Sequence, residues 1–249
     1  MKTRGELKQE VKQLFKGKWK SAILLCIVVS LLSMFGVMSQ YSSRMNRGVD
    51  TSADYSWVKE LSHFSGRDLS IMAGVVVIVL LLQLVFYCVV KIFMTGTIYS
   101  MLDWVRNPQR EIHAVSDSTV GFTKQYAWPI VCLAIFQAVL VFLWSLLLIV
   151  PGIIKSFAYS QTYFVYKDML AATPAGHDRP RYRDAITRSR QLMKGHKFEY
   201  FVLQLSFIGW AILSGITLGI GQLWLTPYRY GVFANYYDNL VKVAATENQ

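Results

Sequence analysis

The sequence is poor in charged residues and in cysteine. Only 16% of its 249 residues are charged, whereas a soluble domain carries about a quarter. The three cysteines, Cys26, Cys88 and Cys132, each lie inside an apolar run and have no metal-ligand spacing. These shortages argue against an ordinary soluble domain and against a disulfide scaffold. We interpret the cysteines as small apolar side chains.

The motifs of common enzyme classes are missing as well. The chain has no Walker phosphate-binding loop, no GxSxG nucleophile motif and no dinucleotide-binding glycine pattern. Four histidines, His63, His113, His177 and His196, are scattered without HExxH spacing. We therefore expect no catalytic residues, no metal site and no cofactor, and a protein that is not an enzyme.

Apolar residues, in contrast, are abundant. They make up 53% of the chain, aromatic residues make up 14%, and the mean hydropathy is +0.33. Several apolar runs approach the roughly 20 residues of helix that cross a bilayer. We predict an all-α polytopic membrane protein, a single membrane domain over residues 1–249, with six transmembrane helices arranged as three helical hairpins. The predicted spans are residues 21–39, 71–97, 128–149, 153–170, 200–218 and 223–241.

The connections between these spans follow from turn residues and polarity. Residues 41–69 are polar, with balanced charges, and are predicted to be the one long loop on the outer side. Pro151-Gly152 is predicted to be the tight turn of the second hairpin. The second span is predicted to stay helical to about Asp103, which is longer than a bilayer needs.

The net charge of +11 invites a nucleic-acid interpretation, which we reject because the positive charges lie beside apolar runs. Most of the 26 Lys and Arg residues lie in the N-terminal segment and in the connectors 104–127 and 167–198. Positively charged loops remain in the cytoplasm. The distribution therefore predicts a multi-pass protein of the cell membrane with both termini in the cytoplasm.

The first 20 residues are predicted to be a basic amphipathic helix in the membrane interface, with Leu7, Val11 and Phe15 dipping into the acyl boundary. The end of this segment, Gln13-Leu-Phe-Lys-Gly-Lys-Trp-Lys20, recurs as Gln191-Leu-Met-Lys-Gly-His-Lys-Phe198. We call these two stretches the lead-in segments. Their lysines are predicted to contact anionic lipid headgroups; the alternative is that they only set orientation during insertion. These lysines are Lys16, Lys18, Lys20, Lys194 and Lys197.

Self-similarity further predicts approximate repeats at residues 1–103, 104–170 and 171–243. Each repeat has a lead-in, an apolar span, an outer turn and a returning span that ends on an aromatic-rich stretch and an aspartate. These aspartates are Asp103, Asp168 and Asp238. We expect them to end helices and to pair with nearby Lys and Arg, rather than to form a free carboxylate ring.

Two long stretches carry a family resemblance: LIVPGIIKSFAYSQTYFVYKD, and AITRSRQLMKGHKFEYFVLQLSFIGWAILSGITLGIGQLWLTPY. They resemble the DUF975 family of bacterial integral membrane proteins, and the similarity extends over nearly the whole chain. It implies a bacterial membrane protein of this fold and supplies no reaction and no site residues. Residues 41–69 and the ATPAGHDRPRY stretch depart from the family pattern and resemble variable inserts.

Three basic residues inside predicted spans are the best site candidates, because a charge at the centre of a bilayer costs at least ~2.5 kcal/mol. Lys91, Lys155 and Arg229 are predicted to form a basic pocket for an anionic headgroup or substrate, or else to snorkel to the interface. Separately, Ala211, Gly215 and Gly219 form a small-residue stripe. Such stripes let helices approach closely.

Two function classes survive. The first is a non-enzymatic membrane scaffold or regulator that contacts anionic lipid. The second is a carrier for a lipid or small amphiphilic molecule, which would need polar residues along an interior path. The expected partners are membrane lipids, with a homo-oligomer or another membrane protein left open, and no nucleic acid.

Overall fold

The computed structural model describes residues 1–47, 66–174 and 177–247, and over these ranges it consists of helices without any strand. The predicted all-α class is therefore confirmed. In chain order the helices are α1 (Arg4–Phe15), α2 (Trp19–Arg47), α4 (Gly66–Arg106), α5 (Ala114–Ser118), the 3-10 helix η1 (Val120–Phe122), α6 (Ala127–Leu147), α7 (Ile149–Ala158), α8 (Thr162–Ala172), α9 (Tyr182–Leu192), α10 (Lys197–Leu205), α11 (Ile208–Ile216) and α12 (Gln222–Glu247).

Helix α1 is the predicted amphipathic helix, but its apolar face packs against protein. Thr3 and Glu6 form a capping box that fixes its start. Leu7, Val11 and Phe15 are almost completely buried, because α12 covers this face of α1. The prediction that these side chains dip into lipid is wrong. After α1 the chain bends by 106° into α2.

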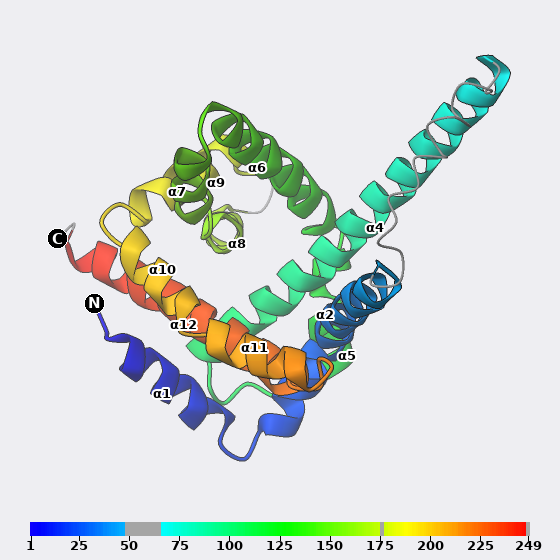
Figure 1. Ribbon diagram of the computed structural model, residues 1–249. Coiled ribbons are helices and arrows are strands. Elements are labelled where there is room, and N and C mark those ends of the chain that lie inside the picture. Colours follow the sequence, from blue (N-terminus) through cyan, green and yellow to red (C-terminus); the bar gives the residue numbers. More distant parts are fainter. Residues whose placement is uncertain (48–65, 175–176, 248–249) are drawn as a thin grey trace.

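Helix α4 is a single helix of 41 residues, about 60 Å long. The predicted continuation of helix to about Asp103 is confirmed. Its N-terminal half projects away from the other helices (Figure 1), and the 18 most apolar residues have no buried member. The predicted loop 41–69 is shorter than expected, because α2 runs to Arg47 and α4 begins at Gly66. Residues 48–65 lie outside the described part.

The second predicted hairpin turns earlier than the sequence suggested. The break between α6 and α7 lies at Leu148, whose backbone is extended (φ −162°, ψ 143°). Pro151 and Gly152 lie within α7, where proline is tolerated near a helix start because its missing N–H is not needed there. The predicted span 153–170 is divided between α7 and α8.

The C-terminal region surrounds α12, the most buried long helix of the described chain. Nearly every residue from Tyr230 to Leu240 is buried. The predicted span 200–218 consists of α10 and α11, separated by a turn at Ser206 and Phe207. The N-terminal end of the described chain lies against α12, since the backbone N–H of Lys2 donates a hydrogen bond to Asn239 Oδ1 (3.2 Å).

Within the described ranges, three helical segments are long and apolar enough to cross a membrane: Ser70–Arg106, Ala127–Leu147 and Lys197–Ile216. Helix α1 and the first part of α2 together also meet the length and hydropathy criteria, so they count as a fourth candidate if they form one broken span. The six predicted spans are therefore not confirmed as six. Of the returning spans, residues 71–97 in α4 pass this test, whereas residues 153–170 and 223–241 fall short because α7 and α8 are short helices and α12 is rich in polar residues.

Pairwise contacts between helices close a ring: α4 packs against α6, α6 against α7, α7 against α10, α10 against α11, α11 against α12, and α12 against α4. Helix α4 also packs against α5 and η1, and α12 against α1 and α2. At two of these contacts a glycine permits the approach. A Cβ on Gly96 of α4 would lie 2.5 Å from the backbone N of Gly121, and one on Gly231 of α12 would lie 2.7 Å from Val11 Cγ1. The three-fold repetition itself stays a prediction.

Candidate functional site

The three repeat aspartates gather at one end of the helix bundle. Asp103, Asp168 and Asp238 come from α4, α8 and α12, and each pairs with at least one cation. The pairs form two groups, one around Arg106 and the other around Asp103. The Arg106 guanidinium donates two hydrogen bonds to Asp168 (2.7 and 2.8 Å) and one to Asp238 (3.0 Å). The planar fork of arginine suits such multiple contacts with carboxylates. One arginine on α4 thus connects two other helices.

The second group of ion pairs surrounds Asp103. Lys167 is buried; its Nζ pairs with Asp103 and donates a hydrogen bond to the backbone O of Tyr99 (2.7 Å). Arg110 pairs with Asp103 (3.3 Å) and with buried Asp117. We call the carboxylates Asp103, Asp168 and Asp238, with Arg106, Arg110 and Lys167, the aspartate cluster.

Each carboxylate of the cluster already accepts a bond from at least one cation. The Tyr237 hydroxyl also donates to Asp168 (2.8 Å), and Lys242 pairs with Asp238. The expected pairing of the aspartates with nearby Lys and Arg is confirmed, but Asp238 does not end its helix, because α12 continues to Glu247. The ion pairs join side chains of different helices and are only partly shielded from water, so the arrangement is suited to holding these helices together.

Sequence reasoning treated Arg106 and Arg110 as orientation signals and did not identify them, Lys167 or Tyr237 as cluster members. A signal was nevertheless present. Arg106 and Arg110 stand three and seven residues after Asp103, which is helical spacing at the end of a span, and Lys167 directly precedes Asp168. What the sequence did not contain was the partner of each cation.

The two lead-in segments adopt the same local structure. In each, a helix ends (α1 at Phe15, α9 at Leu192) and a glycine with positive φ follows, Gly17 at 78° and Gly195 at 88°. A residue with a Cβ is strained in this conformation. The next helix then begins at Trp19 or Lys197. The sequence match between the two segments is therefore reflected in the backbone.

The lead-in lysines lie at the surface. Lys16, Lys18, Lys20 and Lys194 are exposed, and Lys197 is half-buried. Lys18 Nζ donates a hydrogen bond to the backbone O of Pro108 (2.9 Å). The remaining lysines make no ion pair within the described residues. They are free to meet an external anion.

Each in-span cation lies near a different aromatic ring. The distances to the ring centroids are 5.5 Å from Lys91 to Tyr87, 4.2 Å from Lys155 to Trp144, and 6.0 Å from Arg229 to Tyr230. Arg229 lines a groove with Phe157, Phe201 and Phe233, and Lys91 and Lys155 do not line that groove. The shared basic pocket and the alternative of snorkelling both stay predictions.

The small-residue stripe does not form one packed face. A Cβ added to Gly215 would have no heavy atom within 4 Å, and Ala211 is exposed. Only Gly219 is closely packed, with a built Cβ 2.9 Å from Met34 Cγ. The reason is that α11 ends at Ile216, so Gly219 lies in the following turn (φ 90°) and not on the same helical face.

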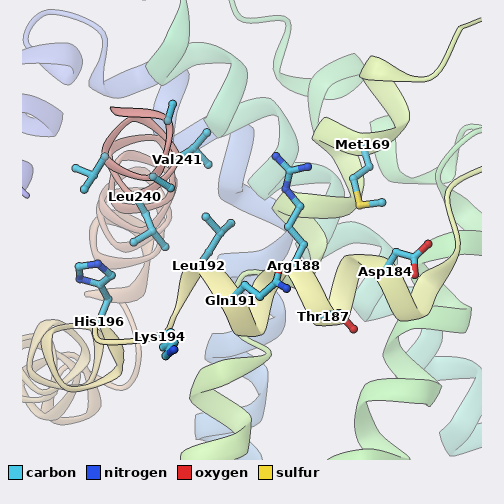
Figure 2. Close-up of a pocket in the computed structure, with 13 residues that line it drawn as sticks. Met169, Asp184, Thr187, Arg188, Gln191, Leu192, Lys194, His196, Leu240 and Val241 are labelled. Atoms are coloured by element: carbon cyan, nitrogen blue, oxygen red, sulfur yellow. The ribbon is translucent and has the colours of Figure 1, made fainter. Parts of the chain in front are cut away.

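Two grooves flank the C-terminal half of α12 near the aspartate cluster. The first, of about 760 Å³, lies between α9 and α12. Figure 2 shows Arg188 and Leu192 extending from α9, with Leu240 and Val241 of α12 beside them. Lys194 and His196 lie at one end and Asp184 at the other (Figure 2). This groove is open and of mixed charge, with cations in excess.

The second groove, of about 410 Å³, lies between α1 and α12 and includes Glu10, Asp238 and Lys242. Asn235 Nδ2 donates hydrogen bonds to Glu10 (2.9 Å) and to the backbone O of Leu7 (3.2 Å). Burial alone would raise the pKa of Glu10, but hydrogen bonds from Lys2 and Asn235 and the positive charge nearby hold it below its ordinary value. This groove is lined by groups that attach α1 to α12.

Comparison with known proteins gives one match. The model of a family described as "Protein of unknown function (DUF975)" matches residues 1–173 and 146–244. No curated protein and no solved structure matches the chain. The match therefore extends over both lead-in segments and all three cluster aspartates.

Proposed function

Because this chain belongs to the DUF975 family, whose function is unknown, and carries three to four helices apolar enough to cross a membrane, we propose that it is a non-enzymatic membrane scaffold or regulator. Its basic lead-in segments contact anionic lipid. The membrane is the cytoplasmic membrane of a bacterium.

One observation carries this proposal: the exposed apolar residues and the exposed lysines lie on different parts of the molecule. Exposed apolar side chains cover the N-terminal half of α4, the join of α6 and α7, and α11. Exposed lysines follow the ends of α1 and α9. An apolar belt with cations along one border is the pattern of a protein embedded in a bilayer with an anionic leaflet.

The proposed topology has three hairpins, six crossings and both termini in the cytoplasm. Two exposed positions test it: Ser116, which precedes η1, and Ile220, in the turn before α12. Each is changed to cysteine after Cys26, Cys88 and Cys132 have been replaced. An impermeant thiol reagent applied to intact cells should label the Ile220→Cys variant and not the Ser116→Cys variant. The reverse pattern would refute this orientation.

Lipid contact is tested by changing Lys16, Lys18, Lys20, Lys194 and Lys197 to glutamine together. Each lysine near an anionic surface contributes about 1 kcal/mol, so the purified variant should retain much less phosphatidylglycerol in native mass spectrometry. The matched control changes Arg44, Arg47, Lys59 and Arg67, from the predicted outer side, to glutamine and should retain lipid as the parent does. Equal retention by the two variants, with topology intact, would contradict the proposal.

The absence of catalysis is part of the proposal and is supported by the aspartate cluster, whose carboxylates are all engaged by cations. A carboxylate held by arginine or lysine is a poor proton acceptor at neutral pH. The cluster is better suited to holding α4, α8 and α12 in register.

A carrier for a lipid or small amphiphilic molecule is the alternative, and Arg229 favours it. Arg229 lines a mostly apolar pocket of about 400 Å³ together with Phe157, Phe201 and Phe233. Its Nε is buried and has no hydrogen-bond partner within the described residues. A transfer assay between donor and acceptor vesicles tests this function. A carrier should accelerate lipid exchange, and Arg229→Gln should slow it; no acceleration by the parent protein would eliminate the alternative.

A further inference from the structure

Helix α1 carries a second face that its packing on α12 leaves open. Arg4, Lys8 and Lys12 follow one another at four-residue spacing and so form one stripe along the helix. None of the three has an ion pair with an acidic side chain among the described residues. Like charges one turn apart repel each other. The stripe is therefore a place where an anion would be stabilised.

Lys8 is the central member and the most constrained. It is half-buried, its Nζ donates a hydrogen bond to Ser206 Oγ (2.7 Å), and the same atom lies 4.6 Å from the ring centroid of Phe207. Burial lowers its pKa, and the charges of Arg4 and Lys12 lower it further. Lys12 Nζ lies 5.9 Å from the Tyr228 ring centroid. Both lysines are thus held toward α11 and α12.

Beside this stripe lies a groove of about 520 Å³, which we call the Lys8 groove. Lys8 and Lys12 provide its charged part, and its walls are mostly apolar, with Trp19, Trp210, Leu213 and Trp224. Its volume lies within the range of about 300–1,000 Å³ that is usual for small-molecule sites. Cations beside an apolar trough are complementary to an anionic amphiphile.

The walls of the Lys8 groove indicate where such an amphiphile would come from. Trp210, Leu213 and Trp224 are each more than half exposed and belong to the apolar surface of the third hairpin. Ser214, on the same wall, is 3% exposed, and its Oγ has no hydrogen-bond partner among the described residues. The groove therefore opens onto the surface that faces lipid in the proposed function.

The lead-in repeat shows that this site is specific to α1. When the two lead-in segments are aligned on Gln13 and Gln191, the positions of Arg4, Lys8 and Lys12 correspond to Tyr182, Ile186 and Arg190. At these three aligned positions α9 has one cation and α1 has three; the other two cations of α9, Arg183 and Arg188, lie at other positions of that helix. A general attraction of both helices to an anionic leaflet would not require the cations of α1 to be aligned in one stripe.

We propose that the Lys8 groove binds one molecule of anionic phospholipid from the surrounding bilayer. The phosphate lies between Lys8 and Lys12, and one acyl chain lies along Trp210, Leu213 and Trp224. This proposal rests on the proposed membrane function but is more specific. It requires that the lipid bind at one site, that its headgroup be anionic, and that one lipid bind per protein molecule.

The test uses the full-length purified protein and titrates phosphatidylglycerol or phosphatidylcholine into it, with the number of bound lipids counted by native mass spectrometry. The parent should bind one phosphatidylglycerol more tightly than those held by the lead-in segments, with clear preference over phosphatidylcholine. The Lys8→Gln/Lys12→Gln variant should bind that lipid at least about tenfold more weakly, since two charge-assisted contacts are lost. Leu213→Glu tests the chain portion, and because Leu213 is 59% exposed, it should weaken binding without lowering the melting temperature.

Two controls separate the possible sources of a result. Lys124→Gln/Arg183→Gln removes two exposed cations that lie outside the groove and outside both lead-in segments, and it should leave the lipid in the groove in place. Inorganic phosphate as competitor should not displace the lipid at comparable concentration; if it does, the site recognises a free anion and the acyl-chain assignment is wrong. Parental affinity in the Lys8/Lys12 variant, or equal binding of phosphatidylcholine, would also overturn the proposal. If the protein still inserts into the membrane, each of these three results would contradict the single lipid site and would not contradict the proposed membrane function.

Discussion

The two halves of α4 belong to one continuous helix and have opposite surroundings. Val76 and Leu82, in the first half, are 54% and 65% exposed, whereas Tyr99 and Trp104, in the second half, are fully buried. Both halves are helical because both are rich in apolar residues and contain no proline. Burial differs because only the second half meets α5, η1, α6 and α12. Helix formation in this segment thus follows from its local sequence, whereas the burial of each half depends on which other helices pack against it.

The largest expected effect comes from comparing one glycine in each half. A side chain at Gly96 would meet the backbone of Gly121, whereas a Cβ at Gly74 would have nothing within 4 Å. Gly96→Leu should therefore lower the free energy of unfolding by ~3 kcal/mol, at the upper end of overpacking effects. Gly74→Leu should be neutral or slightly stabilising, since leucine is the better helix former. Thermal denaturation in detergent compares them, and equal melting temperatures would contradict the described packing.

A charge in the exposed half should act on membrane insertion and leave folding in detergent unchanged. Leu82→Arg should disfavour insertion of this helix by ~2.5 kcal/mol on insertion scales, because position 82 lies in the middle of the apolar stretch. A glycosylation-based insertion assay measures the inserted fraction, with Leu82→Ala as the control. If arginine is inserted as efficiently as alanine, the first half of α4 is not a membrane span.

In the packed half, Arg106→Ala should uncouple α4 from α8 and α12. Breaking a buried ion pair costs about 3–5 kcal/mol, but Arg106 keeps partial access to water, so we expect ~1–2 kcal/mol. Arg106→Lys should recover only part of this loss, because lysine cannot form the paired hydrogen bonds to Asp168. Chemical denaturation of the three proteins measures the effect. Identical midpoints would show that the cluster is not stabilising.

The smallest expected effect concerns the contact of α1 with α12 next to the packed half of α4. The pKa of Glu10 is lowered in the folded protein, so its contribution to stability is present above the ordinary carboxyl pKa and is lost as the pH falls through the lowered value. The parent should lose stability over this acid range more steeply than Glu10→Gln. Melting temperatures measured between neutral and acid pH give the comparison. Parallel pH profiles would contradict a role for the Glu10 carboxylate.

The sequence by itself determined the helical class, the long helix through Asp103 and which side chains form the apolar face of α1. These follow from apolar periodicity, which depends on residues close together in the chain. It also indicated the pairing of the aspartates, since cations stand nearby. The matching lead-in segments adopt matching turns because each contains a glycine with positive φ. The sequence had predicted one helix over the first 20 residues, and the turn at Gly17 interrupts it.

The tertiary structure decided which partner each surface meets. Periodicity identified the apolar face of α1 but could not tell lipid from α12, because both are apolar. The Pro151-Gly152 and Gly215 predictions failed because helix ends depend on packing as well as on composition. The pairing of Arg106 with Asp168 and Asp238, and the pairing of Lys167 with Asp103, join residues far apart in the chain. The position of Lys8 and Lys12 beside an apolar groove does so too. Such contacts are set by how the helices pack, which no local pattern records.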